Sequence, residues 1–323
     1  MPPVVPPAYQ PPRWQRGGHV QTIVPNAFRH VPLVTRIPER LELEDGDFLD
    51  LGWTGHTGDR LAILSHGLEN RHTCNYMQGM ARALAARNWD VLGWTMRGSG
   101  PERNRLLQCY NGGDTRDLHA VVRRALSSHP ARSVALVGFS LGGNLTLKYL
   151  GESARDPRIR AAAAISVPCD LAGSARRLGE PDNRLYMLRF LRKLRRRMRD
   201  KATRFPGKID LEGLDEIRDF ATFDDRYTAP LHGFSSAAEY WEQSSCRPFL
   251  GGIRVPALVL NARNDPFLSE SCHPFDEAAA SAHVHLDCPP QGGHVGFALP
   301  RALRETWADQ RVAAFLRDMP GDP

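Results

Sequence analysis

Ser140 is the residue whose surroundings point most directly to chemistry. It stands at the centre of GFSLG, residues 138–142, which follows the Gly-x-Ser-x-Gly pattern. In this pattern the serine occupies a tight turn from a strand to a helix, and glycines flank it because Cβ atoms there would meet neighbouring backbone. An apolar run comes before Ser140 and a helical pattern follows it. The sequence predicts a nucleophile elbow; a turn with a capping serine would use the same residues.

Asp265 and His294 are the candidate partners of the serine. A serine hydroxyl is a weak nucleophile at neutral pH, so it needs a histidine base and a carboxylate that orients the histidine. After such an elbow the chain order is serine, acid, histidine. Asp265 follows the apolar run 256–263, and His294 lies between glycines after the run 283–289. Asp170, which follows an earlier apolar run, is the rival acid, and we favour Asp265.

Acyl transfer also needs donors for the negative charge that develops on the substrate oxygen. One predicted donor is the backbone N–H of Leu141, directly after the serine. The second is the backbone N–H of Leu68 in SHGLEN, a loop after an early apolar run. His66 in the same loop precedes the serine in the chain, so we interpret it as structural.

These residues require a sheet to bring them together. From residue 61 onward, short apolar runs alternate with amphipathic helical patterns, which is typical of a mostly parallel twisted sheet with helices on both faces. A hairpin around Asp45-Gly46 precedes them. The predicted strands of the sheet cover residues 61–67, 90–98, 133–140, 160–168, 256–263 and 283–289.

Two stretches fall outside this alternation. Residues 1–35 are rich in proline and are expected to form an extended arm without a helix. Nearly ninety residues after Pro168 contain no convincing strand, which predicts an inserted helical subdomain. The expected division is a core over 1–168, a helical insertion over 169–250 and the rest of the core over 251–323.

Charge and cysteine content narrow the functional classes. The 323 residues carry a net charge of +6, but residues 184–204 alone carry +9, which leaves −3 for the rest of the chain. The six cysteines form no C-x-x-C pair and have no metal-ligand spacing with histidine, as expected in a reducing compartment. No secretory leader and no membrane-spanning run is visible, so we expect a soluble, cytoplasmic protein. The chemistry needs no metal or organic cofactor.

The chain resembles the α/β-hydrolase superfamily, and within it the YheT-like subfamily. The stretches that carry this resemblance are GHVQTIVP, SHGLEN, GFSLGGN, FDDRYTAPLHGF, NARNDPF and GGHVGF. The resemblance implies the α/β-hydrolase fold with a helical cap over the active site, and hydrolysis of carboxylic esters, with relatives acting on lipid esters and acylglycerols.

Specific roles follow from the same resemblance. It implies Ser140 as nucleophile, Asp265 as acid, His294 as base, and the N–H groups of Leu68 and Leu141 as oxyanion hole. One departure is Asn70, which stands where the subfamily usually has glycine; asparagine tolerates a left-handed backbone, so we expect the loop to keep its shape.

The basic stretch 184–204 has three interpretations. Its apolar residues Leu185, Leu188, Leu191, Leu194 and Met198 fall on approximately one helical face, with arginines elsewhere. The arginines can form a solvated face, or attract an anionic membrane or an acidic acyl substrate. They can also bind nucleic acid, but no nucleic-acid module is recognisable, so no specific nucleic-acid partner is expected.

The sequence therefore predicts a serine hydrolase acting on a small-molecule ester, with an acyl or lipid-like character. Acyltransferase, thioesterase or amidase activity would use the same three residues. A binding protein without catalysis, built on a hydrolase scaffold, is the alternative from a different class.

Overall fold

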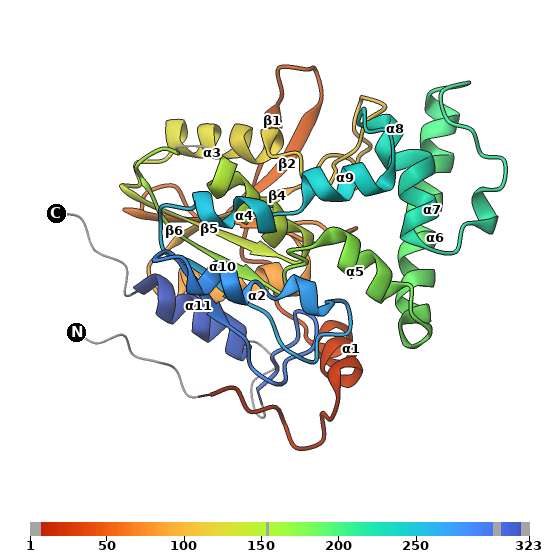
Figure 1. Ribbon diagram of the computed structural model, residues 1–323. Coiled ribbons are helices and arrows are strands. Elements are labelled where there is room, and N and C mark those ends of the chain that lie inside the picture. Colours follow the sequence, from red (N-terminus) through yellow and green to blue (C-terminus); the bar gives the residue numbers. More distant parts are fainter. Residues whose placement is uncertain (1–7, 153–154, 300–304, 318–323) are drawn as a thin grey trace.

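The computed structural model describes residues 8–152, 155–299 and 305–317 (Figure 1). Its centre is one eight-stranded sheet with the order β1-β2-β4-β3-β5-β6-β7-β8. The strands are β1 (Ile37–Glu42), β2 (Phe48–Trp53), β3 (Arg60–Ser65), β4 (Asp90–Thr95), β5 (Ser133–Phe139), β6 (Ile159–Ile165), β7 (Ala257–Leu260) and β8 (Val284–Asp287).

Six of the strands run in parallel, which confirms the predicted mostly parallel sheet. β1 and β2 form the predicted antiparallel hairpin, and β2 also pairs with β4 in the antiparallel sense. β3, β4, β5, β6, β7 and β8 pair in parallel. Because parallel strands share one direction, the segments that follow β3, β5, β7 and β8 leave the sheet at the same edge.

Helices cover both faces of the sheet, as predicted. α3 (Arg116–Ser128) and α4 (Leu141–Glu152) pack on one face, and α2 (Asn75–Ala85) and α11 (Trp307–Arg317) pack on the other. Figure 1 shows α3 and α2 on opposite sides of the strands. The short α10 (Phe275–Ala279) precedes β8.

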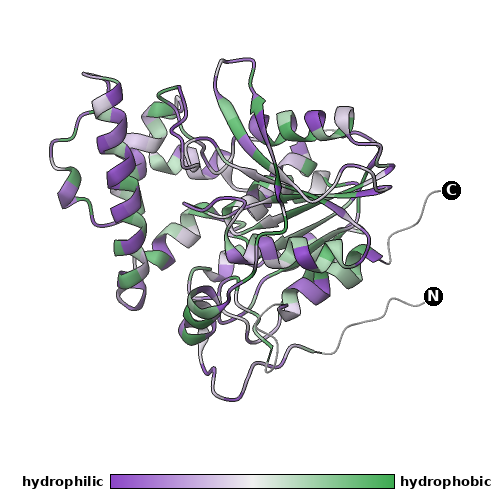
Figure 2. Cartoon of the chain, turned by 180° about the vertical axis from the view of Figure 1, so that it is seen from behind, coloured by the Kyte–Doolittle hydropathy of each residue, from purple (hydrophilic) through white to green (hydrophobic). Residues whose placement is uncertain are grey.

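Successive side chains of a central strand point alternately into two hydrophobic cores, one on each face of the sheet. In β3, Leu61 and Ile63 belong to the core under α3 and α4, while Ala62 and Leu64 belong to the core under α2 and α11. A strand buried on both sides has no polar face, so it reads as a continuous apolar run. Figure 2 shows the central strands in the hydrophobic colour, whereas the helices carry both colours.

Between β6 and β7 the described chain forms helices and no strand. The two ends of this insertion meet, because Arg247 N–H donates to Cys169 O at 3.1 Å and Leu171 N–H donates to Ser245 Oγ at 2.9 Å. Its α-helices are α5 (Leu171–Leu178), α6 (Arg184–Arg204), α7 (Phe220–Phe223), α8 (Ala229–Leu231) and α9 (Ala237–Ser244). In Figure 1, α6 stands at the side of the molecule, away from the sheet.

The expectation of an extended arm over residues 1–35 is wrong in part. Residues Gly18–Phe28 form the helix α1, with Pro25 inside it. A proline lacks the N–H that would bond one turn back, so α1 loses one internal hydrogen bond at Pro25. Arg29 N–H still closes the final turn onto Pro25 O at 3.0 Å. Tertiary packing of α1 against the candidate site stabilises it.

Candidate active site

Ser140 lies at the junction of β5 and α4 in a left-handed conformation, with φ at +52°. A non-glycine residue adopts this conformation only where its surroundings impose it. Here Ser140 N–H donates to Ile165 O of β6 at 2.8 Å. A Cβ atom at Gly138 would lie 2.3 Å from Gly142 O, and one at Gly142 would lie 2.4 Å from Ser65 O. The predicted elbow geometry is therefore present, and its glycines are sterically required.

Ser140, His294 and Asp265 form one hydrogen-bonded chain. The Ser140 Oγ lies 3.0 Å from His294 Nε2, and His294 Nδ1 lies 2.8 Å from Asp265 Oδ2 and 3.1 Å from Oδ1. Asp265 and His294 are buried, at 3% and 7% exposed. The Asp265 carboxylate accepts a hydrogen bond from Nδ1–H, so Nε2 is the nitrogen that accepts a hydrogen bond from the serine hydroxyl.

Phe267 fixes both members of the acid–histidine pair. Its backbone N–H donates to Asp265 Oδ1 at 2.9 Å, and its ring centroid lies 4.2 Å from the imidazole of His294. The carboxylate orientation and the plane of the imidazole are thus both held by one residue two positions after the acid.

The rival acid does not contact the histidine. Asp170 caps α5, where its Oδ1 accepts from Gly173 N–H at 3.0 Å and its Oδ2 accepts from Ser271 Oγ at 2.5 Å. Both oxygens of the Asp170 side chain are therefore used at the start of α5, where the insertion begins.

His66 has a structural role, as interpreted from the sequence. Its Nδ1 donates to Gly67 O at 2.7 Å, and its Nε2 accepts from Met96 N–H at 2.9 Å. The side chain is fully buried, and this burial lowers the pKa of the imidazole to about 4, although the bond to Gly67 acts in the opposite direction. The ring fastens the loop after β3 to the end of β4.

Leu68 and Leu141 line the same cavity as Ser140 and His294. Within the described residues neither backbone N–H has a protein acceptor. Leu141 begins α4, so its N–H also lies at the positive end of the helix dipole. The left-handed residue of the Leu68 loop is Glu69, with φ at +56°, so the tolerance of Asn70 for this conformation is not used.

Sequence reasoning missed the residues of α1 that hold the histidine loop. Thr22 Oγ1 accepts from His294 N–H at 2.8 Å and donates to Gly18 O at 2.7 Å. Gln21 is fully buried, and its Oε1 accepts from Asn264 Nδ2 and from Gly292 N–H, both at 2.9 Å. One glutamine therefore joins the loop of Asp265 to the loop of His294.

Close backbone packing explains why α1 carries these residues. A Cβ atom at Gly18 would lie 1.9 Å from Asn264 O, and one at Gly296 would lie 2.0 Å from Gln21 O. The stretch GHVQTIVP, which contains Gly18, Gln21 and Thr22, was one of those that carry the resemblance to the YheT-like subfamily. Nothing local in this stretch indicates which loop it contacts.

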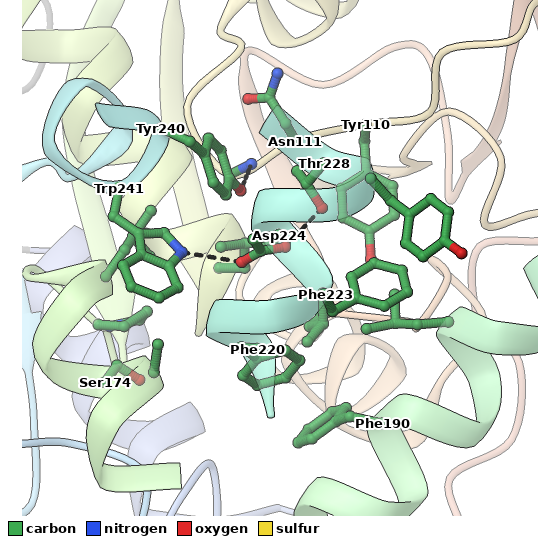
Figure 3. Close-up of a pocket in the computed structure, with 18 of the residues that line it drawn as sticks. Tyr110, Asn111, Ser174, Phe190, Phe220, Phe223, Asp224, Thr228, Tyr240 and Trp241 are labelled. Atoms are coloured by element: carbon green, nitrogen blue, oxygen red, sulfur yellow. Dashed lines mark hydrogen bonds between the residues drawn. The ribbon is translucent and has the colours of Figure 1, made fainter. Parts of the chain in front are cut away.

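The cavity at Ser140 lies between the sheet edge and the insertion and has a volume of about 140 Å³. The basic helix α6 contributes Phe190, Leu194 and Met198 to its wall. Figure 3 shows Phe190, Phe220 and Phe223 around the cavity, with Asp224 hydrogen-bonded to Thr228 and Trp241. Burial raises the pKa of Asp224 to about 6. Arg197 and His232 also line the cavity, whose wall is otherwise mostly apolar.

Residues 8–152, 155–299 and 305–317 contain no group of three or more histidine, cysteine or acidic side chains arranged to hold a metal ion. None of their helices combines the length and the apolar character that crossing a bilayer requires.

Known proteins share this architecture. Residues 63–298 match the alpha/beta hydrolase fold family. The chain is 32% identical to the Escherichia coli (strain K12) protein named "Putative esterase YheT", over 92% of this chain and 89% of that protein. The chain belongs to the α/β-hydrolase family. The resemblance to the YheT-like subfamily is thereby confirmed.

More distant relatives of this α/β hydrolase carry related names. The monoacylglycerol lipase of Saccharomyces cerevisiae is 27% identical over 80% of this chain and 59% of its own length. Human phospholipase ABHD3 is 25% identical over 98% of this chain and 80% of its own length. The structure of the Pyrococcus furiosus esterase Pf2001 superposes with a TM-score of 0.59 at 17% identity, over 91% of this chain and 99% of that chain, which shows a shared fold.

The low pKa of His66 predicts acid sensitivity in this hydrolase. The imidazole titrates near 6.5 in the unfolded chain and near 4 in the folded one, so the unfolded state binds more protons between these values. Stability is fully present above pH 6.5 and falls as the pH drops toward 4, by about 2 kcal/mol at pH 5 for this residue.

NMR titration of the His66 ring and urea unfolding at pH 8 and pH 5 test this prediction. The ring resonance should stay in its neutral position down to about pH 5. His66→Gln should reduce the pH dependence of the unfolding free energy. A ring that titrates near 6.5 in the folded protein contradicts the prediction.

Proposed function

We propose that this α/β hydrolase cleaves carboxylic esters through an acyl-enzyme formed on Ser140. The observation that carries the proposal is the unbroken hydrogen-bonded chain from Ser140 Oγ through His294 to Asp265. The names of the relatives add support, since esterases, monoacylglycerol lipases and phospholipases all act on esters.

Acylation begins when Ser140 Oγ attacks the carbonyl carbon and its proton moves to His294 Nε2. Asp265 stabilises the resulting imidazolium through Nδ1–H. The carbonyl oxygen becomes an oxyanion that accepts hydrogen bonds from the N–H groups of Leu68 and Leu141. The loss of one such donor typically costs about 3–4 kcal/mol of transition-state stabilisation. The intermediate collapses as the carbon–oxygen bond to the alcohol breaks and His294 protonates the leaving oxygen.

Deacylation repeats these steps with water. His294 Nε2 accepts a proton from water as the water oxygen attacks the acyl carbon. The second intermediate expels Ser140 Oγ, which regains the proton from His294, and the carboxylic acid leaves. No cofactor takes part in either half of this proposed reaction.

The wall of the cavity favours an acyl or lipid-like substrate. The insertion covers Ser140 as a cap, and its contribution to the wall is mainly apolar. Burial of apolar surface is worth about 25 cal/mol per Å², so an aliphatic chain gains binding energy there. Hydrolysis uses water as the acyl acceptor. Product analysis with alcohol, thiol or amine acceptors would reveal acyltransferase activity. Turnover of thioester or amide substrates would reveal thioesterase or amidase activity.

Replacing the nucleophile tests the proposal. Ser140→Ala should abolish turnover of p-nitrophenyl butyrate and labelling by a fluorophosphonate, because both reactions form a bond to Oγ. The matched control is Ser127→Ala, which changes an exposed serine on α3. Unchanged turnover in Ser140→Ala would reject the proposal, and absence of labelling in the wild type would favour a binding protein without catalysis.

The contact between α1 and the histidine loop predicts a separate loss of rate. Thr22→Val removes the hydroxyl that accepts from His294 N–H. We expect kcat to fall about fivefold with little change in KM, since one hydrogen bond is worth about 1 kcal/mol. Kinetics on p-nitrophenyl butyrate measure this.

Thr203→Val is the matched control for that variant. Thr203 makes the same bond to the carbonyl four residues back, at 3.0 Å, but lies exposed on α6. A loss of kcat in Thr203→Val equal to that in Thr22→Val would show that the effect does not come from the histidine loop.

We propose further that the outward face of α6 contacts an anionic lipid surface. Leu185 and Leu188 were expected on the apolar face with Leu191, but they are 78% and 45% exposed, whereas Leu191 is buried. They share the outward face with Arg184, Arg189, Arg192 and Arg196, which are exposed and have no ion-pair partner among the described residues. A face of this composition suits an anionic membrane.

Sedimentation with vesicles tests this surface. Arg192→Gln/Arg196→Gln should weaken binding to phosphatidylserine-containing vesicles roughly 30-fold at low salt, since each cation near the surface contributes about 1 kcal/mol. Arg116→Gln/Arg123→Gln removes the same charge from exposed positions of α3 and should have a much smaller effect. Equal losses in both variants, or no binding by the wild type, would reject the proposal.

A cytoplasmic location is also a proposal. All six cysteines are free thiols, and Cys109, Cys169, Cys246 and Cys272 are buried. Thiols in this state are typical of a reducing compartment.

A further inference from the structure

The loop that carries Leu68 is held by the basic helix of the insertion. Glu69 follows Leu68 directly and has a left-handed backbone, with φ at +56°. For a residue with a Cβ atom this conformation is unfavourable and persists only where the surroundings impose it. The contacts of Glu69 therefore hold the backbone directly after Leu68 in place.

Three polar groups of Glu69 are engaged, namely its N–H, its backbone carbonyl and Oε1. Its N–H donates to Tyr110 Oη at 2.9 Å, and the Tyr110 hydroxyl donates to Glu69 Oε1 at 3.1 Å. Arg197 forms an ion pair with the same carboxylate at 2.5 Å. Lys193 Nζ donates to the backbone carbonyl of Glu69 at 2.8 Å. Two of these three partners, Lys193 and Arg197, come from α6.

The ion pair is buried. The side chains of Arg197 and Glu69 are each 9% exposed, and the guanidinium lies 4.9 Å from the ring centroid of Tyr110. A buried charge that loses its partner is strongly unfavourable, so each member constrains the position of the other. An exposed pair at the end of two long side chains would give no such constraint.

The inward cations of α6 follow the helical repeat. Lys193, Arg197 and Lys201 are four residues apart, so they lie on one face. Lys201 Nζ donates to Asn104 Oδ1 at 2.7 Å, which fixes the later part of the helix to the core. The cations of the basic stretch therefore form two groups. The outward arginines are exposed, whereas these three cations contact the core of the enzyme.

We propose that Arg197 and Lys193, acting through Glu69, position the Leu68 N–H for the developing oxyanion. This inference rests on the proposed function, because it assigns the partners of one of its two oxyanion donors. Both cations are positioning residues, since neither contacts the reacting atoms. Without them Glu69 can leave the left-handed conformation, and the oxyanion keeps only the donor at Leu141.

Arg197→Met and Lys193→Met test the inference on p-nitrophenyl butyrate, with Arg199→Met as the matched control. Arg199 lies on the same helix, but its ion pair with Asp215 is exposed. We expect kcat to fall about 10- to 100-fold in Arg197→Met and about threefold to tenfold in Lys193→Met, with KM within threefold. Arg197→Lys retains the charge and should recover part of the rate.

Inhibitor binding separates positioning from a general loss of structure. An alkyl trifluoromethyl ketone adds to a serine hydroxyl and forms an oxyanion, so its affinity should fall by the same factor as kcat/KM. The affinity for a product carboxylic acid of the same chain length should change less than threefold. Should Arg197→Met fail to fold, Lys193→Met and Arg197→Lys decide the question with the same two measurements.

The outcomes distinguish the two proposals. If Ser140→Ala retains turnover, the proposed function fails and the inference falls with it. If Ser140→Ala is inactive but Arg197→Met and Lys193→Met behave like Arg199→Met, the inference alone is overturned. Equal losses of affinity for the ketone and for the carboxylic acid would also overturn it, because they indicate a damaged cavity.

Discussion

The left-handed turn at Ser140 is the constraint on which the rest of the site depends. A strand that enters this turn and a helix that leaves it must approach each other closely, and only residues without a Cβ atom fit at Gly138 and Gly142. The same turn sets the serine oxygen at the edge of the sheet where β7 and β8 also end. Asp265 and His294 can meet Ser140 there because the strands before them are parallel to β5 and end at the same edge.

The loops that carry Asp265, His294 and Leu68 need further contacts to hold these residues in position. In this protein such contacts come from two sides. On one side α1 binds the loops of Asp265 and His294 through Gln21 and Thr22. Both side chains are buried polar groups with satisfied hydrogen bonds, so moving either loop would expose an unpaired donor or acceptor to an apolar interior. A proline-containing helix of eleven residues is stable here because of these contacts.

On the other side the insertion contributes both the cavity wall and the contacts to Glu69. The helix α6 presents Phe190, Leu194 and Met198 to the cavity, while Arg197 on the same helix pairs with Glu69. Net charge therefore says little about the role of this helix. Cations with the same formal charge are divided by the helical repeat into an outward group in solvent and an inward group bound to the core.

The sequence by itself determined the class of the fold and the order of its strands along the chain, and it singled out Ser140, Asp265 and His294, which the structure brings together. These features depend on local patterns: apolar runs of strand length, a glycine-flanked turn, and polar residues that directly follow strands. It also favoured Asp265 over Asp170; in the structure Asp265 lies against His294, whereas Asp170 caps a helix. Only the tertiary structure decided that residues 18–28 are helical, that Leu185 and Leu188 face outward, and that Glu69 and not Asn70 is left-handed. Each of these depends on contacts between segments more than forty residues apart, and no local pattern in a single sequence encodes such a contact.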